Sequence, residues 1–296
     1  MIRCPGIAPL EWLARGIARL PQSFLLRLAS LLAGLSQVFW ARRRRVAQAN
    51  IALVFPELDP PAQGRLLQAN LRETLMGGFE LLRAWYAPDS RLRDAVVIEG
   101  LEHLHAAKAA GQGVLLFTGH FTQTELAAWL LKRATGGVVR GVVRRHNSAC
   151  VEDMFERARQ RIFGATLAKK DVRGMLRALQ AGEWVVYSAD QDFNYQHAFV
   201  PFFGIPAATF TGTAELVRRS GARMLPFWFH RGADGRYHLR IEAEWPGWRD
   251  AEPAQSAAIY MQQLERVVRE HPEQYLWVHR RFKTRPPGEA PVYHQA

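Results

Sequence analysis

The second half of the chain alternates short apolar runs with longer stretches of helical spacing, and this alternation constrains the fold more than any other feature. The short runs predict buried strands, and in the longer stretches apolar residues recur every three or four positions. Predicted strands cover 96–100, 114–117, 137–143, 184–188, 223–230 and 237–243, and predicted helices cover 62–85, 101–110, 151–162, 172–181, 209–219 and 251–269. We therefore predict an α/β fold with a central mixed β-sheet flanked by helices.

The first 45 residues predict a membrane-attachment helix with a basic end. The longest stretch without charge, Leu28 to Ala41, has 14 residues, whereas a spanning helix needs about 20. Four arginines follow at 42–45, and aromatic residues such as Trp12 and Trp40 suit head-group depth. The helix either spans the membrane or lies in its interface. The alternative is a buried amphipathic helix with a solvated basic end. Residues 46–296 form the second predicted domain.

The net charge of +12 predicts an anionic partner. Nucleic acid, an anionic membrane surface and an acidic protein or substrate all fit that sign. We do not expect nucleic acid, because the basic residues are not interleaved with aromatics along one face. The two cysteines lack metal-ligand spacing, and no glycine-rich phosphate loop, G-x-S-x-G or H-E-x-x-H motif is present. We therefore expect neither a metal nor a bound cofactor.

One imidazole and one carboxylate stand where a predicted strand passes into a helix. The apolar run 114–117 is followed by Thr118 and Gly119, and a helical pattern opens near His120 with Glu125 five residues on. An imidazole with a carboxylate within reach is the minimum for taking a proton from an alcohol. The alternative is a half-buried loop histidine and a solvated helical glutamate.

Further polar residues follow other predicted strands. Arg144 comes after 137–143, and Asp190 and Asp192 come after 184–188. In an open α/β sheet, ligands bind at the carboxyl ends of the strands. We therefore expect these residues to share one cleft with His120.

The segment G-H-F-T-Q-T-E fits an H-x-x-x-x-[D/E] motif after an apolar strand, the signature of glycerolipid-type acyltransferases. Around it the chain resembles the late acyltransferases of lipid A biosynthesis, the lauroyl/myristoyl family of Gram-negative bacteria. The segments that carry the resemblance, in order, are 50–57, 113–125, Arg144 with Asn147, 170–175, 190–192, 199–203, 211–213 and the run E-Q-Y-L-W-V-H-R-R-F-K at 273–283. One departure is Val143-Arg144-Arg145, where many relatives have Tyr-Arg-Pro.

The resemblance implies a glycerolipid acyltransferase-like fold, with residues 46–296 as the catalytic domain. It implies an inner-membrane enzyme whose site faces the cytoplasm and whose anchor contacts anionic inner-membrane lipids. The implied reaction moves a fatty acyl chain from acyl carrier protein to a hydroxyl of a Kdo-bearing lipid A precursor. An alternative acceptor is another membrane lipid, such as an ornithine lipid or a glycolipid.

In that reaction His120 is the expected general base, because its ordinary pKa lies near working pH. Glu125 either holds the imidazole in one tautomer or takes the larger share of the base chemistry. Arg144 either stabilises the oxyanion or binds a lipid phosphate, or else it is a surface arginine at the end of a strand.

The remaining candidates have a binding and a structural interpretation each. Asp190 and Asp192 orient Arg144 or substrate hydroxyls, or else cap local backbone. Arg280, with its neighbours Arg281 and Lys283, either contacts phosphates or forms a solvated basic tail.

Overall fold

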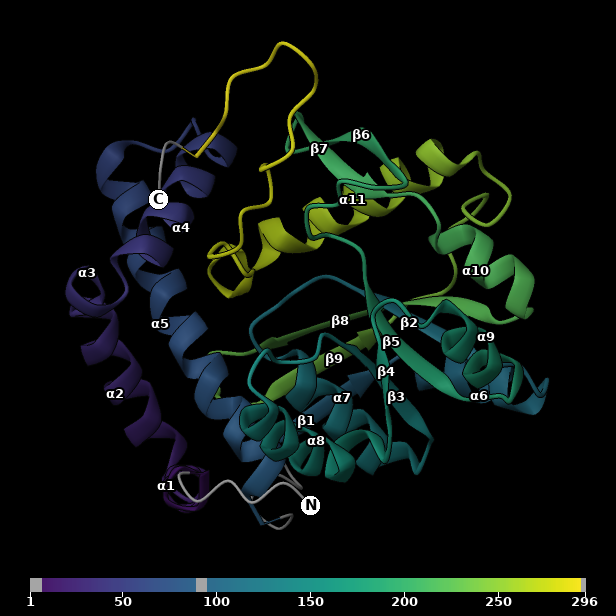
Figure 1. Cartoon of the computed structure of the whole chain (residues 1–296), viewed down its shortest axis with the longest axis horizontal. Coiled ribbons are helices and arrows are strands. Elements are labelled where there is room, and N and C mark those ends of the chain that lie inside the picture. The colour runs from purple at the N-terminus through teal and green to yellow at the C-terminus, as the bar shows by residue number, and fades with distance from the viewer. Residues whose placement is uncertain (1–6, 89–94, 294–296) are drawn as a thin grey trace.

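The computed structural model describes residues 7–88 and 95–293, and its centre is a seven-stranded sheet (Figure 1). The strand order is β1-β9-β8-β2-β5-β3-β4. Only β8 and β9 pair antiparallel; the other neighbours in this sheet are parallel. The predicted mixed sheet is confirmed. Its strands are β1 (Val96–Glu99), β2 (Val114–Thr118), β3 (Val139–Val143), β4 (Thr166–Ala168), β5 (Trp184–Ser188), β8 (Arg223–Arg231) and β9 (Tyr237–Ile241).

Helices cover both faces of the sheet, as predicted. Figure 1 shows α7 and α8 below the strands and α10 and α11 above them. The helices that follow the N-terminal segment are α4 (Ala41–Val54), α5 (Pro60–Tyr86), α6 (Leu101–Ala109), α7 (Thr124–Thr135), α8 (Ala149–Phe163), α9 (Val172–Gln180), α10 (Thr213–Ser220) and α11 (Pro253–Glu270). The longest, α5, begins where Asp59 accepts a hydrogen bond from the Ala62 N–H at 2.7 Å, with prolines in its first turn.

The central strand β2 explains why the candidate residues converge. All five of its residues are buried, and it pairs with β5 on one side and β8 on the other. In the parallel β2–β5 pair, Thr118 lies opposite Ser188. His120 and Asp190 each follow that pair by two residues, so both leave the sheet at the same edge.

A hairpin that was not predicted lies between β5 and α10, in a region where the sequence predicts a helix over 209–219. Instead β6 (His197–Phe202) and β7 (Ile205–Phe210) pair antiparallel, and α10 begins only at Thr213. Their two-residue turn, Phe203-Gly204, has φ of 53° and 74°. Such turns usually carry Asn-Gly or Asp-Gly, so the usual hairpin signal was absent.

Three short helices replace the single apolar helix expected in the N-terminal segment: α1 (Ile7–Ile17), α2 (Gln22–Gly34) and α3 (Ser36–Phe39). Pro21, which has no backbone N–H, stands immediately before α2. Leu25 and Ala29 of α2 are fully buried in a cluster with Met76 of α5. No helix within the described residues is long and apolar enough to cross a membrane. Residues 1–6 of the predicted segment lie outside the described residues.

Candidate active site

His120 and Asp190 form the central pair of the site. Nδ1 of His120 lies 2.6 Å from Oδ1 of Asp190, and the His120 backbone N–H donates to Oδ2 at 2.9 Å. The Tyr275 hydroxyl donates to the same Oδ2 at 2.8 Å. Asp190 is 1% exposed, whereas the His120 side chain is 33% exposed. The other imidazole nitrogen, Nε2, has no protein hydrogen-bond partner within the described residues. The ring is therefore fixed on one edge and free on the other.

The electrostatics of this pair favour a charged imidazole beside a charged carboxylate. Burial alone would lower the pKa of His120, but the charge of Asp190 and its hydrogen bond raise that pKa. Burial alone would raise the pKa of Asp190, but His120 and the hydrogen bonds from Tyr275 and the backbone hold that pKa well below its usual range. A proton accepted at Nε2 is therefore stabilised by Asp190.

The loop that carries His120 is held by a segment far along the chain, just after α11. Residues Phe121 and Tyr275 form an isolated antiparallel bridge, the Thr122 N–H donates to the Gln274 carbonyl, and the Leu276 N–H donates to the His120 carbonyl, both at 3.0 Å. On its other side the loop touches α5 at Gly77, where a Cβ atom would lie 2.5 Å from the Thr122 carbonyl oxygen. The His120 backbone is thus fixed from two directions.

The structure corrects the expected partner of the imidazole, which is Asp190 and not Glu125. The helix α7 begins at Thr124, so residues 120–123 are a loop and the five-residue spacing is not a helical one. The Glu125 Oε1 atom accepts hydrogen bonds from Nε and Nη2 of Arg159 at 3.0 and 2.9 Å. Its Oε2 atom accepts one from the Trp85 indole at 3.0 Å. Glu125 therefore joins α7 to α8 and α5.

A basic cavity of about 290 Å³ lies beside the Glu125–Arg159 pair. It is lined by four residues that follow β3 and by two residues of α8: Arg144, Arg145, His146, Asn147, Phe155 and Arg159. Arg144 is exposed, while the Arg159 side chain is only 11% exposed. Arg144 was expected to be oriented by an aspartate, but Asp190 bonds to His120 and Tyr275 instead. This cavity concentrates positive charge beside Glu125, and neither His120 nor Asp190 is among its lining residues.

The other predicted residues have structural contacts. Asp192 accepts hydrogen bonds from the Thr284 N–H at 2.8 Å and from the Thr284 hydroxyl at 2.9 Å, as the capping alternative expects. The Arg280 guanidinium lies over the Tyr293 ring, 5.8 Å from its centroid. Arg281, next in sequence, is fully buried and donates to the Ala208 carbonyl and the Thr209 hydroxyl. Arg281 is therefore not part of a solvated basic tail.

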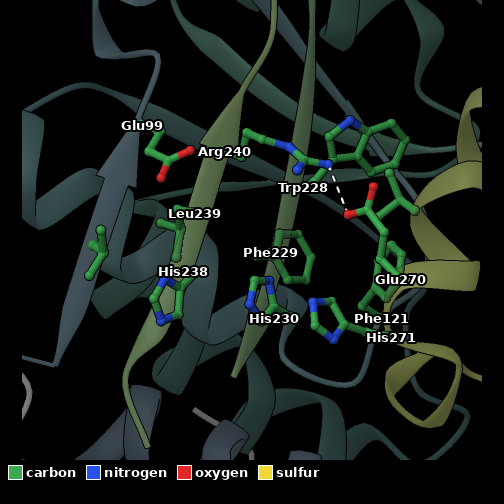
Figure 2. Close-up of a pocket in the computed structure, with 12 residues that line it drawn as sticks. Glu99, Phe121, Trp228, Phe229, His230, His238, Leu239, Arg240, Glu270 and His271 are labelled. Carbon is green, nitrogen blue, oxygen red and sulfur yellow. Dashed lines mark hydrogen bonds and ion pairs between the residues drawn. The ribbon is translucent and has the colours of Figure 1, made fainter. Parts of the chain in front are cut away.

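A second cavity lies behind the His120 loop, between β8, β9 and the end of α11 (Figure 2). Three of its lining side chains are stacked imidazoles: the His230 ring lies 3.9 Å from that of His271 and 5.0 Å from that of His238, measured between centroids. Burial, followed by the charges of these two neighbours, lowers the pKa of His230 to about 4. Within the described residues, no three His, Cys, Asp or Glu side chains are placed to hold a metal ion. His271 directly precedes the segment that holds the His120 loop, so the stack supports that segment.

Two residues of the site were missed by the sequence analysis. Arg159 lies in a predicted helix, and nothing in the sequence distinguishes this nearly buried arginine from the solvated arginines around it. Tyr275 lies within the family-like run 273–283, which was the only signal for it. Both are found only when the contacts of Glu125 and Asp190 are known.

Comparison with known proteins gives a consistent result. Residues 10–284 match the family described as bacterial lipid A biosynthesis acyltransferase. The chain is 35% identical over 299 residues to the lipid A biosynthesis palmitoleoyltransferase of Escherichia coli (strain K12), covering 96% of this chain and 94% of the relative. It is 34% identical over 286 residues to the lauroyltransferase of the same strain, covering 94% and 93%. A lipid A biosynthesis acyltransferase of Haemophilus influenzae is 33% identical over 255 residues, covering 84% and 80%.

Proposed function

Because the chain belongs to the family of bacterial lipid A biosynthesis acyltransferases, we propose that it transfers a fatty acyl chain from acyl carrier protein to a hydroxyl of a Kdo-bearing lipid A precursor. Lipid A acyltransferase activity follows from the family. The observation that carries the finer assignment is the His120–Asp190 pair, whose Nε2 edge is free at the carboxyl ends of the central strands.

In this reaction His120 is the general base. Its Nε2 takes the proton of the acceptor hydroxyl as the oxygen attacks the thioester carbonyl. A C–O bond forms and the C–S bond breaks, and the proton then passes from Nε2 to the leaving thiolate. Asp190 holds Nδ1 and stabilises the imidazolium between these two transfers, and Tyr275 and the His120 backbone hold Asp190 in turn.

Glu125 acts through Arg159. The carboxylate holds the guanidinium by two hydrogen bonds at the wall of the cavity that Arg144 also lines. A guanidinium held in place can bind two oxygens of a phosphate through bidentate hydrogen bonds. We therefore assign the cavity to the anionic groups that the substrates carry, and Glu125 and Arg159 to positioning.

Substitution of Glu125 by Gln is expected to lower kcat/KM by about ten- to a hundred-fold, because it leaves a nearly buried guanidinium without its counter-charge. Arg159→Gln should have a similar effect, and the double variant should be no worse than either single one, since the two side chains act as a unit. Steady-state kinetics of the three variants measure this.

The matched control is Glu183→Gln. Glu183 also accepts two hydrogen bonds from one arginine, Arg140, at 2.7 and 2.8 Å, but it lies before the amino end of β5. This control should keep wild-type kcat/KM. Equal losses in Glu125→Gln and Glu183→Gln would show that the effect is one of general stability, and would remove Glu125 from the site.

We also place the protein on the inner membrane, through the outer face of α1–α3. Large apolar side chains are exposed there: Leu10, Trp12, Leu13, Phe24, Leu31, Leu35, Val38 and Phe39. Val38 is 85% exposed and Trp12 is 78% exposed. An exposed apolar face of this extent marks an interaction surface, and the arginines at 42–45 next to it suit anionic head groups.

Charge introduced on that face is expected to weaken membrane attachment. Val38→Glu/Phe39→Glu should move most of the protein from floating vesicles of anionic phospholipid to the soluble fraction, because both side chains would have to take a carboxylate into the bilayer interface. Flotation of the wild type and the variant measures the shift. Gln substitution at exposed Arg65 and Arg236, outside α1–α3, makes the same change in net charge and serves as its control. An unchanged floating fraction would place the membrane contact elsewhere.

The activity is tested by incubating the purified protein with acyl-acyl carrier protein and a Kdo-bearing tetra-acylated precursor. Mass spectrometry should show a product heavier by one acyl chain, and His120→Ala should abolish it. Formation of acyl-ornithine lipid or acyl-glycolipid in place of that product would assign the enzyme to another acceptor. No product with any donor chain length or precursor would overturn the assignment.

A further inference from the structure

Exposed cations gather on the turn after β4 and on the outer face of α9. We call this group the β4–α9 basic patch, and it consists of Lys169, Lys170, Arg173 and Arg177. Their side chains form no ion pair within the described residues. Arginines on several other elements are paired with carboxylates: Arg140 with Glu183, Arg218 with Glu215, Arg249 with Glu244 and Arg266 with Glu242. The patch therefore presents uncompensated positive charge.

The patch is continuous with the basic cavity. The Lys169 N–H donates to the Val143 carbonyl at 3.0 Å, so the turn after β4 leaves the sheet directly beside Arg144. Arg144 and Arg145 are themselves exposed, and both line the cavity that holds Arg159. Cations thus lie on neighbouring elements from α9, through Arg144 and Arg145, to the cavity that Arg159 lines.

The composition of the patch fits a protein better than a lipid surface. Val172, which is 52% exposed, stands between Lys170 and Arg173, so an apolar side chain lies inside a charged rim. The one acid within this segment, Asp171, caps the start of α9 by accepting the Gly174 N–H at 2.8 Å, and its single charge is outnumbered by those of the four cations around it. In Figure 1, α9 lies at the opposite edge of the molecule from α1–α3, where the larger exposed apolar face is.

We propose that the β4–α9 basic patch docks the acidic protein that carries the acyl thioester, and that the adjoining cavity then receives the anionic linker of that protein. The inference rests on the proposed function, since it names the surface by which the donor reaches the same site. Complementary charge accelerates such an encounter and sets its orientation, and it makes both sensitive to salt.

The test compares Lys170→Glu/Arg173→Glu with two controls in the full-length, detergent- or nanodisc-held enzyme. One control keeps the charge at the same positions, Lys170→Arg/Arg173→Lys. The other makes the same charge change elsewhere, Arg65→Glu/Arg236→Glu. Binding of acyl-acyl carrier protein is measured directly, and KM is measured for three substrates: the acyl-protein donor, the small donor acyl-pantetheine and the lipid acceptor.

Charge reversal in the patch should weaken donor binding and raise the donor KM about tenfold or more, with kcat and the acceptor KM unchanged. Both controls should behave as wild type, and use of acyl-pantetheine should be equal in all variants. Raising salt should weaken donor binding in the wild type and have little effect in the reversed variant. A raised acceptor KM with an unchanged donor KM would assign the patch to lipid phosphates and overturn the proposal, as would unchanged donor binding. A wild type that binds and uses no acyl-protein donor would contradict the proposed function itself.

Discussion

Asp190→Asn should lower kcat about 10³- to 10⁴-fold while leaving the KM for the acceptor lipid nearly unchanged. The carboxylate is 1% exposed and bonds to Nδ1 of His120, so in the proposed mechanism it acts through the imidazole and is not expected to contact the substrate. An amide at this position neither stabilises the imidazolium nor enforces the tautomer that leaves Nε2 free to accept a proton. Steady-state kinetics with the lipid acceptor measure the loss.

The pH profile separates this effect from simple damage to the fold. A general base must be neutral, so the wild-type kcat/KM should rise with pH through an apparent pKa above 6.5, because Asp190 raises the pKa of His120. In Asp190→Asn the rise of kcat/KM with pH should shift to lower pH, because burial lowers the pKa of His120 and no carboxylate charge raises it again. The control is Asp192→Asn, whose carboxylate bonds to Thr284, and we expect its kcat within about threefold of wild type. An Asp190→Asn enzyme with wild-type turnover would remove the pair from the mechanism.

Arg231→Met should lower the free energy of unfolding by about 3–5 kcal/mol at neutral pH, which is the cost of leaving buried charge unpaired. At the end of β8, the nearly buried Arg231 side chain donates to Glu80 at 2.9 Å and also to Glu73, and both carboxylates come from α5. The Tyr237 hydroxyl donates to Glu80 at 2.9 Å, but the other oxygen of Glu80 is buried without a partner. Urea unfolding followed by circular dichroism measures the loss.

The loss should grow with pH. Burial raises the pKa of Glu80 to about 7 even with Arg231 present. Between pH 4.5 and 7 the folded state therefore binds more protons than the unfolded state, and this group's contribution to stability falls as pH rises. Without Arg231 the Glu80 carboxyl stays protonated to still higher pH, so the loss of unfolding free energy should be larger at pH 8 than at pH 5.

Arg266→Met is the control: Arg266 also pairs with two carboxylates, but it is 43% exposed and its loss should cost less than about 1 kcal/mol. Equal effects of the two substitutions would contradict the argument.

Six of the seven strands of the sheet were predictable, because hydrophobic periodicity reports burial; β4, which has three residues and is only half-buried, was not predicted. The runs at 114–117 and 184–188 fall on β2 and β5, and the polar residues after them converge because carboxyl ends of neighbouring parallel strands share one edge. What a single sequence does not contain is the order of the strands. Without knowing that β2 pairs with β5, the nearest carboxylate along the chain, Glu125, looked like the partner of His120. The actual partner, Asp190, lies 70 residues after His120 in the sequence.

The β6–β7 hairpin shows a different reason for failure. Local turn chemistry predicts hairpins when it follows the common pattern, and Phe203-Gly204 does not, because a phenylalanine rarely adopts φ of 53°. Here tertiary packing decides: the Phe203 N–H donates to Glu265 of α11 at 2.7 Å, and Phe202 is fully buried. Contacts between residues so far apart in the sequence cannot be predicted from a short stretch of neighbouring residues.

The hydrogen bonds that hold the His120 loop have a consequence for the order of biosynthesis. Chains emerge from the ribosome N-terminus first, so α1–α5 and the central strands are available long before residues 272–284. Yet the Tyr275 hydroxyl donates one of the hydrogen bonds that hold Asp190. Asn70 of α5 in turn donates to the carbonyls of Glu273 and Tyr275, at 2.9 and 2.7 Å. A nascent chain can thus form its N-terminal helices while the surroundings of the His120–Asp190 pair are still incomplete. A chain that ends before Tyr275 lacks the hydroxyl that donates to Asp190, so we expect it to form most of the sheet without completing the candidate site.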